Sequence, residues 1–189
     1  MKRQAIFLKN FIKNPRQMGS ITPSSRILAR SMVKDINFNE PCVIVEYGPG
    51  EGVFTKNIIN QLNEDSVFVI IEVNIDFYRK LKEAYSDLPN VHVFLESVCQ
   101  TDKILEGLNI DKVDYIVSGI PFSSISSQLS KDIIEVTSKI LADHGVFITF
   151  QYTNTKMSLF STSFKTISVS KVWRNFPPAF IFTCSNRPL

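Results

Sequence analysis

The chain has 189 residues, 44% hydrophobic and 21% charged, a composition typical of one globular domain with a sizeable core. No apolar run approaches the roughly 20 residues that span a bilayer, and the first residues lack a signal-peptide core and cleavage site. We therefore expect a cytoplasmic protein that at most lies on a membrane surface.

Cysteine and histidine support neither a disulfide framework nor a metal site. The three cysteines, Cys42, Cys99 and Cys184, are an odd number without Cys-x-x-Cys spacing, and each lies in or near an apolar segment. We expect reduced packing residues. His92 and His144 lie far from any group of cysteines or carboxylates at ligand spacing, so no metal is expected.

The net charge of +3 is unevenly distributed along the chain. Residues 1–34 hold eight of the 21 Lys and Arg residues and no Asp or Glu, which leaves 13 basic against 18 acidic residues elsewhere. This pattern predicts an acidic body, residues 38–189, preceded by a basic N-terminal arm, residues 1–37. The arm is expected to face an anionic partner.

The arm opens with a helical pattern from about Arg3 to Lys13. One side of that helix carries Phe7, Leu8, Phe11 and Ile12, and the opposite side carries Lys2, Lys9 and Lys13, with Ile6 as the exception. Such a helix can lie in a phospholipid interface, or it can dock its apolar side on its own domain. Prolines and a glycine then break the pattern, and a second helix, capped by Thr22 or Ser24, runs to about Lys34.

Strands and helices alternate from residue 42 onward. The expected strands are 42–47, 67–73, 91–95, 113–118 and 144–151, and the expected helices are 53–62, 75–86, 101–107 and 125–141. This alternation predicts a parallel sheet with helices on both faces. A helix near 156–164 and strands at 166–172 and 179–183 predict a closing antiparallel hairpin, for seven strands in all.

The stretch 43–53 carries the clearest ligand-binding pattern. An apolar strand leads into Glu46, and Gly48, Gly50 and Gly52 follow at every second position before a helix. The pattern favours a sharp turn that a ligand approaches closely, and the absence of a P-loop lysine argues against a triphosphate. S-adenosylmethionine fits, because it is a nucleoside whose sulfonium and ammonium are cationic. Glycines after a strand can also mark only a tight turn.

A second carboxylate strengthens the nucleoside interpretation. Glu72 ends the second strand, 24 residues after Gly48, where a carboxylate can accept both ribose hydroxyls. An acidic residue at a strand end is otherwise a solvated terminus or a helix cap. Polar turns follow the other strand ends, and Ser97 or Val98 is expected near the adenine. The expected cofactor-binding residues are Glu46, Tyr47, Gly48, Gly50, Gly52, Glu72, Val73, Ser97, Val98 and Ser118.

The glycine turn, Glu72 and the segment 118–122 resemble the Rossmann-like S-adenosylmethionine-dependent methyltransferases. Within that class, segments 14–25, 151–153 and 173–179 look like those of the bacterial phospholipid N-methyltransferases. The resemblance implies an α/β Rossmann-like fold, a phosphatidylethanolamine-type amine as acceptor, and peripheral association with an anionic membrane.

The ribosomal RNA adenine dimethyltransferases are similar as well. Their fourth motif resembles Asn-Leu-Pro-Tyr, whereas this chain has Gly119-Ile-Pro-Phe122 and therefore lacks the amide. Ser97 also stands where an Asp is common, and we expect no C-terminal helical domain of the kind those enzymes carry. An RNA acceptor, with Phe122 stacking on the base, stays an alternative, as does a non-catalytic S-adenosylmethionine-binding protein.

The expected catalytic residues are Tyr152, Ser118, Pro121 and Phe122. Methyl transfer from a sulfonium needs a neutral amine aimed in line with the methyl carbon, so the protein mainly positions the reactants. Tyr152 and the carbonyls of the 118–122 turn are candidates to orient the amine. The rings of Tyr47, Phe122 and Tyr152 offer cation–π contacts to a methylated ammonium, although each of them also suits core packing.

Overall fold

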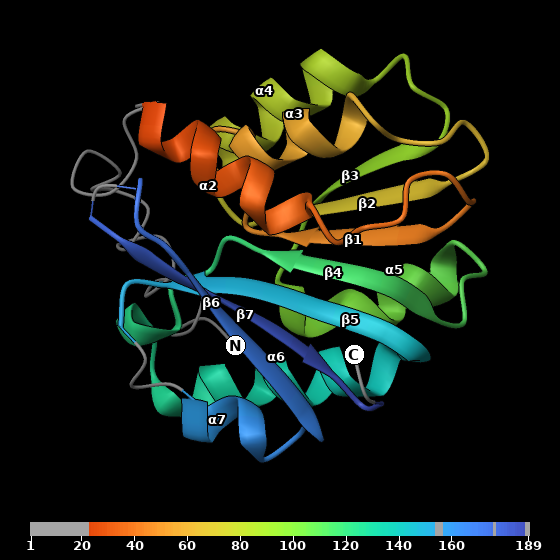
Figure 1. Ribbon diagram of the computed structural model, residues 1–189. Coiled ribbons are helices and arrows are strands. Elements are labelled where there is room, and N and C mark those ends of the chain that lie inside the picture. Colours follow the sequence, from red (N-terminus) through yellow and green to blue (C-terminus); the bar gives the residue numbers. More distant parts are fainter. Residues whose placement is uncertain (1–22, 154–156, 176, 188–189) are drawn as a thin grey trace.

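A computed structural model describes residues 23–153, 157–175 and 177–187 (Figure 1). Within these residues seven strands form one sheet in the order β3-β2-β1-β4-β5-β7-β6. Neighbouring strands from β3 to β5 pair in parallel, whereas β7 is antiparallel to both β5 and β6. The mostly parallel seven-stranded sheet with a closing hairpin is thus confirmed.

The strands are β1 (Val43–Tyr47), β2 (Val67–Glu72), β3 (Val91–Leu95), β4 (Val113–Ser118), β5 (Leu141–Gln151), β6 (Thr166–Val172) and β7 (Ala179–Ser185). The helices are α2 (Pro23–Val33), α3 (Val53–Ile59), α4 (Ile75–Tyr85), α5 (Thr101–Gly107), α6 (Ser127–Ile140) and α7 (Met157–Ser161). Two short 3₁₀ turns, η2 (Val98–Gln100) and η3 (Phe122–Ser124), follow β3 and β4.

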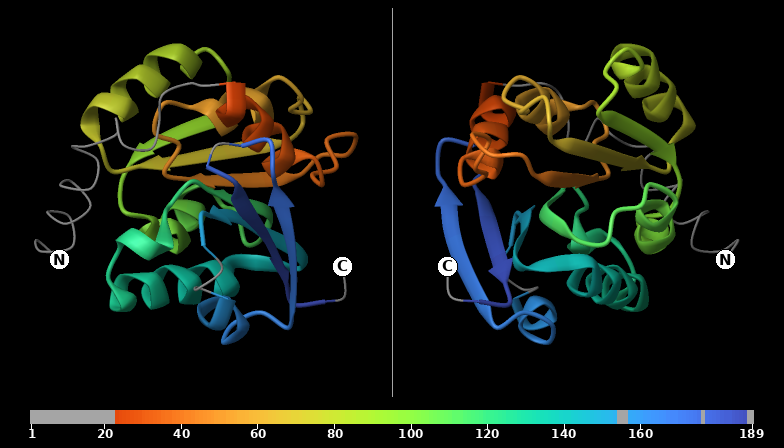
Figure 2. Two further views of the ribbon diagram at one scale, coloured as in Figure 1. Left: turned by 60° about the vertical axis from the view of Figure 1, so that its left-hand side comes forward. Right: turned by 90° about the vertical axis from the view of Figure 1, so that its right-hand side faces the viewer.

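The helices cover both faces of the sheet. Figures 1 and 2 show α2, α3 and α4 on one face and α5, α6 and α7 on the other. Each face has its own apolar cluster, one including Leu28, Phe54 and Phe68, the other including Val45, Ile133 and Phe147. Because the central strands are buried on both faces, they read as continuous β-branched and aromatic runs in the sequence.

Side-chain caps explain where two of the helices begin. The Asn74 side chain accepts hydrogen bonds from the backbone N–H groups of Asp76 and Phe77 at the start of α4. The Ser126 hydroxyl accepts one from Leu129 at the start of α6. These caps satisfy helix N–H groups that have no partner within the helix, and they fix the turns that precede each helix.

Several expected boundaries differ from the structure by one to three residues. β5 begins at Leu141 rather than at 144, because an irregular register between Val113 and Tyr115 extends the pairing of β4 with β5. Helix α3 ends at Ile59 rather than at 62, and its last turn closes through a bond from the Gln61 N–H to the Ile58 carbonyl. Strand β7 continues to Ser185, two residues past the expected end.

The N-terminal region is described only from Pro23. The expected membrane-active helix from Arg3 to Lys13 and the expected cap Thr22 lie outside the described residues, and Ser24 lies inside α2. Helix α2 contacts α3 and packs Leu28 and Ala29 into the cluster on its face of the sheet. This part of the expected arm is therefore built into the core of the body.

Candidate active site at the carboxyl ends of the strands

The glycine turn between β1 and α3 has the left-handed backbone that glycine tolerates best. Gly48, Gly50 and Gly52 have φ values of 61°, 56° and 74°. The Gly48 N–H donates to the carbonyl of Ile71 at 3.0 Å, which ties the turn to the end of β2. A Cβ placed on Gly50 would meet no heavy atom within 4 Å, so the turn borders open space there.

Glu72 is organised as an acceptor at the tip of β2. Its Oε1 accepts the backbone N–H groups of Val73 and Asn74, both at 2.8 Å, and its Oε2 accepts the N–H of Gly50 at 3.1 Å. Burial raises the pKa of the Glu72 carboxyl, and these three backbone hydrogen bonds oppose that rise. The structure therefore brings the predicted carboxylate into direct contact with the predicted glycine turn.

Glu46 is a fully buried carboxyl at the end of β1. Its Oε2 accepts a hydrogen bond of 2.7 Å from the Thr55 hydroxyl on α3, and its Oε1 has no partner within the described structure. Burial raises the pKa of Glu46 to about 8, against the hydrogen bonding from Thr55 and with a further contribution from the charge of Glu72. A cation beside Glu46 would reverse this effect, because it favours the charged carboxylate.

The turn after β4 packs directly against the glycine turn. Gly119 donates its N–H to the Tyr47 carbonyl at 2.8 Å, and a Cβ on Gly119 would lie only 2.5 Å from the Gly48 carbonyl oxygen. A side chain at position 119 would therefore collide with the backbone of the glycine turn. The missing amide noted in the sequence has a structural reason in this chain, since the local backbone leaves room for glycine alone.

The backbone carbonyls of this turn differ in whether a donor already forms a hydrogen bond to them. Thr149 donates to the Ser118 carbonyl at 3.4 Å, Gln151 donates to the Ile120 carbonyl at 3.3 Å, and the Pro121 carbonyl accepts the Ser124 N–H at 2.9 Å. Within the described part of the chain, no group donates to the carbonyl oxygen of Gly119. That oxygen is a free acceptor next to the glycine turn. Sequence reasoning named the carbonyls of the whole turn and did not distinguish this one.

Gln151 is a second feature that sequence reasoning passed over. Its side chain is buried at the end of β5, and its amide holds the Ile120 carbonyl while its Oε1 has no partner among the described residues. The Ser118 hydroxyl similarly accepts the Ile120 N–H at 3.2 Å. Ser118 and Gln151 thus fix the shape of the 118–122 turn from inside the protein. The signal available in the sequence was a polar residue, Gln151, at the end of an apolar strand.

The three candidate aromatic rings occupy different environments. Tyr47 is fully buried on the α5–α6 face, where burial raises its pKa to about 12. The Phe122 ring is also fully buried and packs edge-on against Phe147 and Phe160. Tyr152 is half-buried at the end of β5 beside Phe150, so it alone of the three is partly accessible at this edge of the sheet.

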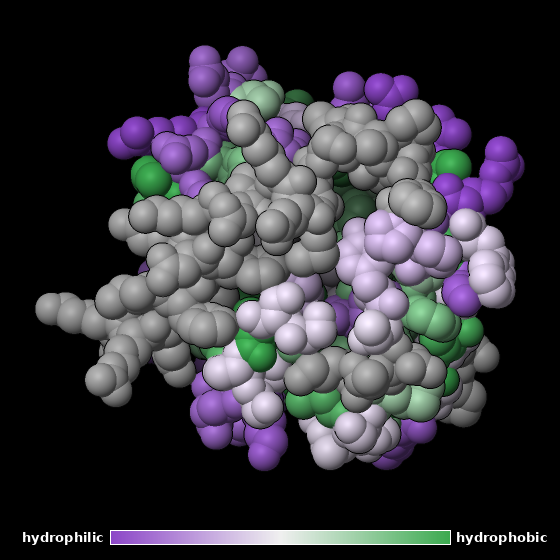
Figure 3. All heavy atoms as spheres, turned by 90° about the vertical axis from the view of Figure 1, so that its left-hand side faces the viewer, coloured by the Kyte–Doolittle hydropathy of each residue, from purple (hydrophilic) through white to green (hydrophobic). Residues whose placement is uncertain are grey.

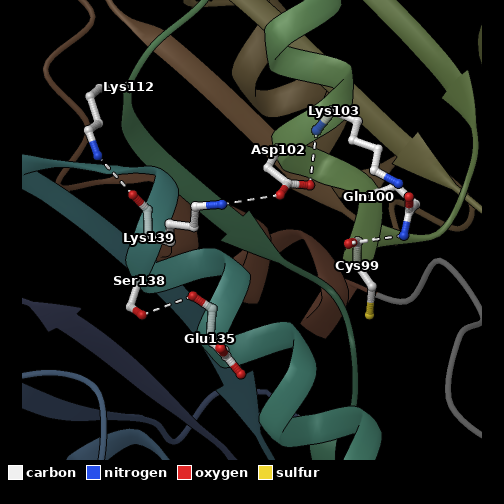
Figure 4. A network of polar contacts seen from close by, with 8 residues as sticks. All are labelled: Cys99, Gln100, Asp102, Lys103, Lys112, Glu135, Ser138 and Lys139. Atoms are coloured by element: carbon white, nitrogen blue, oxygen red, sulfur yellow. Dashed lines mark hydrogen bonds and ion pairs between the residues drawn. The ribbon is translucent and has the colours of Figure 1, made fainter.

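The turn after β3 continues the same edge. The Ser97 hydroxyl accepts the Cys99 N–H at 3.3 Å and caps η2, and Val98 is buried below it. The polar contacts around Cys99 and Gln100 lead into α5, whose Asp102 pairs with Lys139 of α6 at 3.5 Å (Figure 4). Ser97 therefore shapes the turn, and the neighbouring Glu96 ties it to β2, because its N–H donates to the Glu72 carbonyl at 3.1 Å.

These residues suit S-adenosylmethionine. The open space beside Gly50 admits a ligand, and the Glu72 carboxylate lies at its border. The Glu46 Oε1, which has no partner among the described residues, can accept a hydrogen bond or contact a cation. Among the described residues no group of three or more His, Cys, Asp or Glu side chains could hold a metal ion. In the same part of the chain no helix is long and apolar enough to cross a membrane.

The fold and the site define an S-adenosylmethionine-dependent methyltransferase. The sequence also matches the model of the ribosomal RNA adenine dimethylase family over residues 3–171, and the chain belongs to that family. The family match confirms the cofactor and the enzyme class that the sequence predicted, and the sheet confirms the fold.

Individual relatives differ in what they act on. The chain is 31% identical over 187 residues to an ornithine lipid N-methyltransferase from Singulisphaera acidiphila, covering 97% of this chain and 96% of the relative. It is 29% identical over 154 residues to ribosomal RNA small subunit methyltransferase A from Ureaplasma parvum, covering 74% of this chain and 53% of that protein.

Solved structures share the fold at low sequence identity. The Burkholderia thailandensis 1,6-didemethyltoxoflavin-N1-methyltransferase, solved with S-adenosylhomocysteine, superposes with a TM-score of 0.73 at 13% identity, covering 97% of this chain and 88% of that one. The N-methyltransferase NodS from Bradyrhizobium japonicum gives 0.71 at 11% identity, covering 89% and 99%.

Proposed function

We propose that the protein methylates the primary amine of a membrane lipid headgroup, of the phosphatidylethanolamine or ornithine lipid type. The observation that carries this proposal is the match to a lipid N-methyltransferase over 97% of the chain and 96% of the relative. The lack of room for a side chain at Gly119 also supports the proposal. The matching motif of the ribosomal RNA adenine dimethyltransferases resembles Asn-Leu-Pro-Tyr and has an asparagine amide at this position.

The cofactor is held, in this proposal, by the residues of the glycine turn and the two carboxylates. Glu72 accepts the ribose hydroxyls, Gly50 leaves the space that the nucleoside needs, and Glu46 faces the cationic end. When bound, S-adenosylmethionine supplies a methyl group on a positively charged sulfur. Ser97 and Val98 border the adenine from the η2 turn.

The acceptor amine is positioned by the turn after β4. The free carbonyl of Gly119 accepts an N–H of the amine and so directs the nitrogen lone pair, while Ser118 and Gln151 keep that turn in place. Burial raises the pKa of Tyr152, against a hydrogen bond with Asn175, so its hydroxyl stays protonated at neutral pH. Tyr152 is therefore assigned to orient the substrate rather than to remove its proton.

The basic arm contributes a membrane contact to the proposal. Residues 1–34 have no acidic residue, and their first 13 residues have the pattern of an interfacial helix. Such an arm would hold the protein at an anionic leaflet, where its lipid substrate lies.

Methyl transfer from radiolabelled S-adenosylmethionine tests the proposal directly. Vesicles containing phosphatidylethanolamine, vesicles containing ornithine lipid, and ribosomal RNA are offered separately, with Glu72→Ala as the control with weakened cofactor binding. We expect label in at least one lipid. Label in RNA alone would replace this function with the adenine methylation that the family model and the Ureaplasma relative favour. Cofactor binding without turnover on any of these acceptors would indicate a non-catalytic binding protein.

A further inference from the structure

The C-terminal part of the chain has the same charge bias as the arm. Residues 144–189 contain Lys156, Lys165, Lys171, Arg174 and Arg187 and no Asp or Glu. The described part of this stretch comprises the rest of β5, helix α7 and the β6–β7 hairpin, and it follows a body in which acidic residues dominate. Two cationic stretches therefore lie at opposite ends of the sequence.

The tertiary structure places the β6–β7 turn at the edge of the sheet that carries the site. Val172 pairs with Ala179 at the end of the hairpin, and Phe180 also pairs with Gln151 at the carboxyl end of β5. The described residues of this turn, 173–175, 177 and 178, therefore extend from the same edge as the glycine turn. Helix α2 contacts both hairpin strands, and Figures 1 and 2 show it beside this end of β6 and β7.

Trp173 is the most exposed large hydrophobic residue among those described. Its side chain is 71% exposed, and the Lys171 ammonium lies 3.6 Å from the centre of its ring. Arg174 is exposed next to it, and Arg26 and Arg30 are exposed on the adjacent α2. Within the described structure none of these four cations forms an ion pair, so their charge is available to an external anion.

Figure 3 views the molecule from the side on which the hairpin turn and the start of α2 lie. The described surface visible on this side mixes purple, pale and green groups. A broad apolar plate is thus lacking over the described surface in this view. An exposed Trp173 beside Lys171 and Arg174 suits a lipid headgroup interface, where indole rings and basic side chains are both favoured.

We propose that the β6–β7 turn is a second membrane contact, in which Trp173 enters the headgroup layer of an anionic bilayer while Lys171 and Arg174 bind lipid phosphates. A bilayer suits this surface better than RNA does, because the Lys171 ammonium already covers one face of the indole and restricts base stacking. The docked turn would set the sheet edge against the headgroups. That orientation rests on the proposed function, whereas the membrane contact itself does not.

Trp173 is the only tryptophan of the chain, so its fluorescence reports this contact specifically. Full-length protein is titrated with phosphatidylcholine vesicles, with and without phosphatidylglycerol. We expect a blue shift, and quenching by brominated lipids, with the anionic vesicles. An emission spectrum that stays unchanged although the protein co-sediments with these vesicles would overturn the proposal, since the arm alone would then hold the protein.

Substitutions separate the two components of the contact. Trp173→Ala should weaken vesicle binding on the order of tenfold at any salt concentration, because it removes apolar burial. The double variant Lys171→Ser, Arg174→Ser should lose about fivefold per basic residue, and this loss should shrink at high salt. Trp173→Phe, which keeps an aromatic ring, should bind better than Trp173→Ala, and cofactor binding confirms that each variant is folded.

The matched charge control lies at the opposite edge of the sheet. Lys112 and Lys139 are exposed where β4 begins and α6 ends, and the Lys112 ammonium donates to the Lys139 carbonyl (Figure 4). Replacing both by serine should leave vesicle binding nearly unchanged. A loss equal to that of the Lys171 and Arg174 variant would indicate a non-specific charge effect and refute the site.

The same variants distinguish this inference from the proposed function. If wild-type protein binds vesicles through Trp173 but methylates no lipid, the contact stands and the proposed function fails. If lipid methylation proceeds and Trp173→Ala binds vesicles as wild type does, the function stands and the contact fails. Affinity for an RNA oligonucleotide that falls with Trp173→Ala, without any change toward vesicles, would reassign the surface to RNA.

Discussion

We predict that ionisation of the buried Glu46 carboxyl lowers the stability of the fold and raises the affinity for S-adenosylmethionine. Burial raises its pKa to about 8 from an ordinary value of 4.5. Because the folded-state pKa lies above the unfolded one, the contribution to stability is complete below about pH 4.5 and is lost as pH rises toward 8. At about 1.4 kcal/mol per pH unit, the loss between pH 5 and 8 is at most about 4 kcal/mol.

Glu46→Gln removes this loss, since the amide resembles the protonated carboxyl and does not ionise. The difference in unfolding free energy, variant minus wild type, should therefore grow by about 2–4 kcal/mol from pH 5 to pH 8. Urea denaturation followed by circular dichroism at each pH measures it. A constant cost or gain from the amide cancels, because only the change with pH is used.

The variant should bind S-adenosylmethionine more weakly than wild type. In wild type the cationic ligand requires the charged form of Glu46, so affinity should rise relative to the variant between pH 6 and 8, with release of a proton on binding. Isothermal titration calorimetry in buffers of different ionisation enthalpy detects that proton. Glu51→Gln, at an exposed carboxylate of the same turn, is the matched control for losing one charge.

Parallel pH profiles for wild type and Glu46→Gln would refute the reasoning. They would mean that Glu46 titrates alike in the folded and unfolded chains, and that water or another donor solvates its unpartnered oxygen. An unchanged cofactor affinity would separately remove Glu46 from the binding site.

Three further predictions test other parts of the site. Glu72→Ala should lower S-adenosylmethionine affinity by about 1.5–3 kcal/mol, because it removes charged hydrogen bonds, whereas Glu51→Ala should change it little; equal calorimetric affinities for the two variants would refute the ribose assignment. Gly119→Ala should cost about 1–3 kcal/mol of unfolding free energy and most of the methyl transfer, because its Cβ would lie 2.5 Å from the Gly48 carbonyl oxygen. Gly107→Ala, whose Cβ would meet nothing within 4 Å, is its control, and full stability with full activity in Gly119→Ala would contradict the close packing of the two turns. Deleting residues 1–13 should reduce co-sedimentation with anionic vesicles most strongly at low salt; equal co-sedimentation at every salt concentration would count against an electrostatic arm.

The parts of the site that could be read from the sequence are local. The glycine turn needs positive φ at alternate positions, and a strand ending in Glu46 or Glu72 is visible as a short apolar run followed by a carboxylate. The alternation of such runs with helices was enough to predict the sheet and its closing hairpin. Local backbone geometry and hydrophobic period carry this information in consecutive residues.

Contacts between distant segments required the tertiary structure. Gly119 is confined by Gly48, and the Ile120 carbonyl is held by Gln151, about 30 residues further along the chain. The burial of the Phe122 ring depends on Phe147 and Phe160 from two other elements. Nothing in the residues next to each of these positions encodes its partner.

The surroundings of Trp173 show the same difference between local sequence features and contacts that depend on the tertiary structure. The sequence by itself determined the order of strands and helices and placed the glycine turn and the two carboxylates at strand ends, because each follows from neighbouring residues. Only the pairing of β7 with both β5 and β6 brought the cationic turn around Trp173 to the edge that carries the site. Strand pairing is decided by which surfaces can be buried together, and that depends on the whole chain.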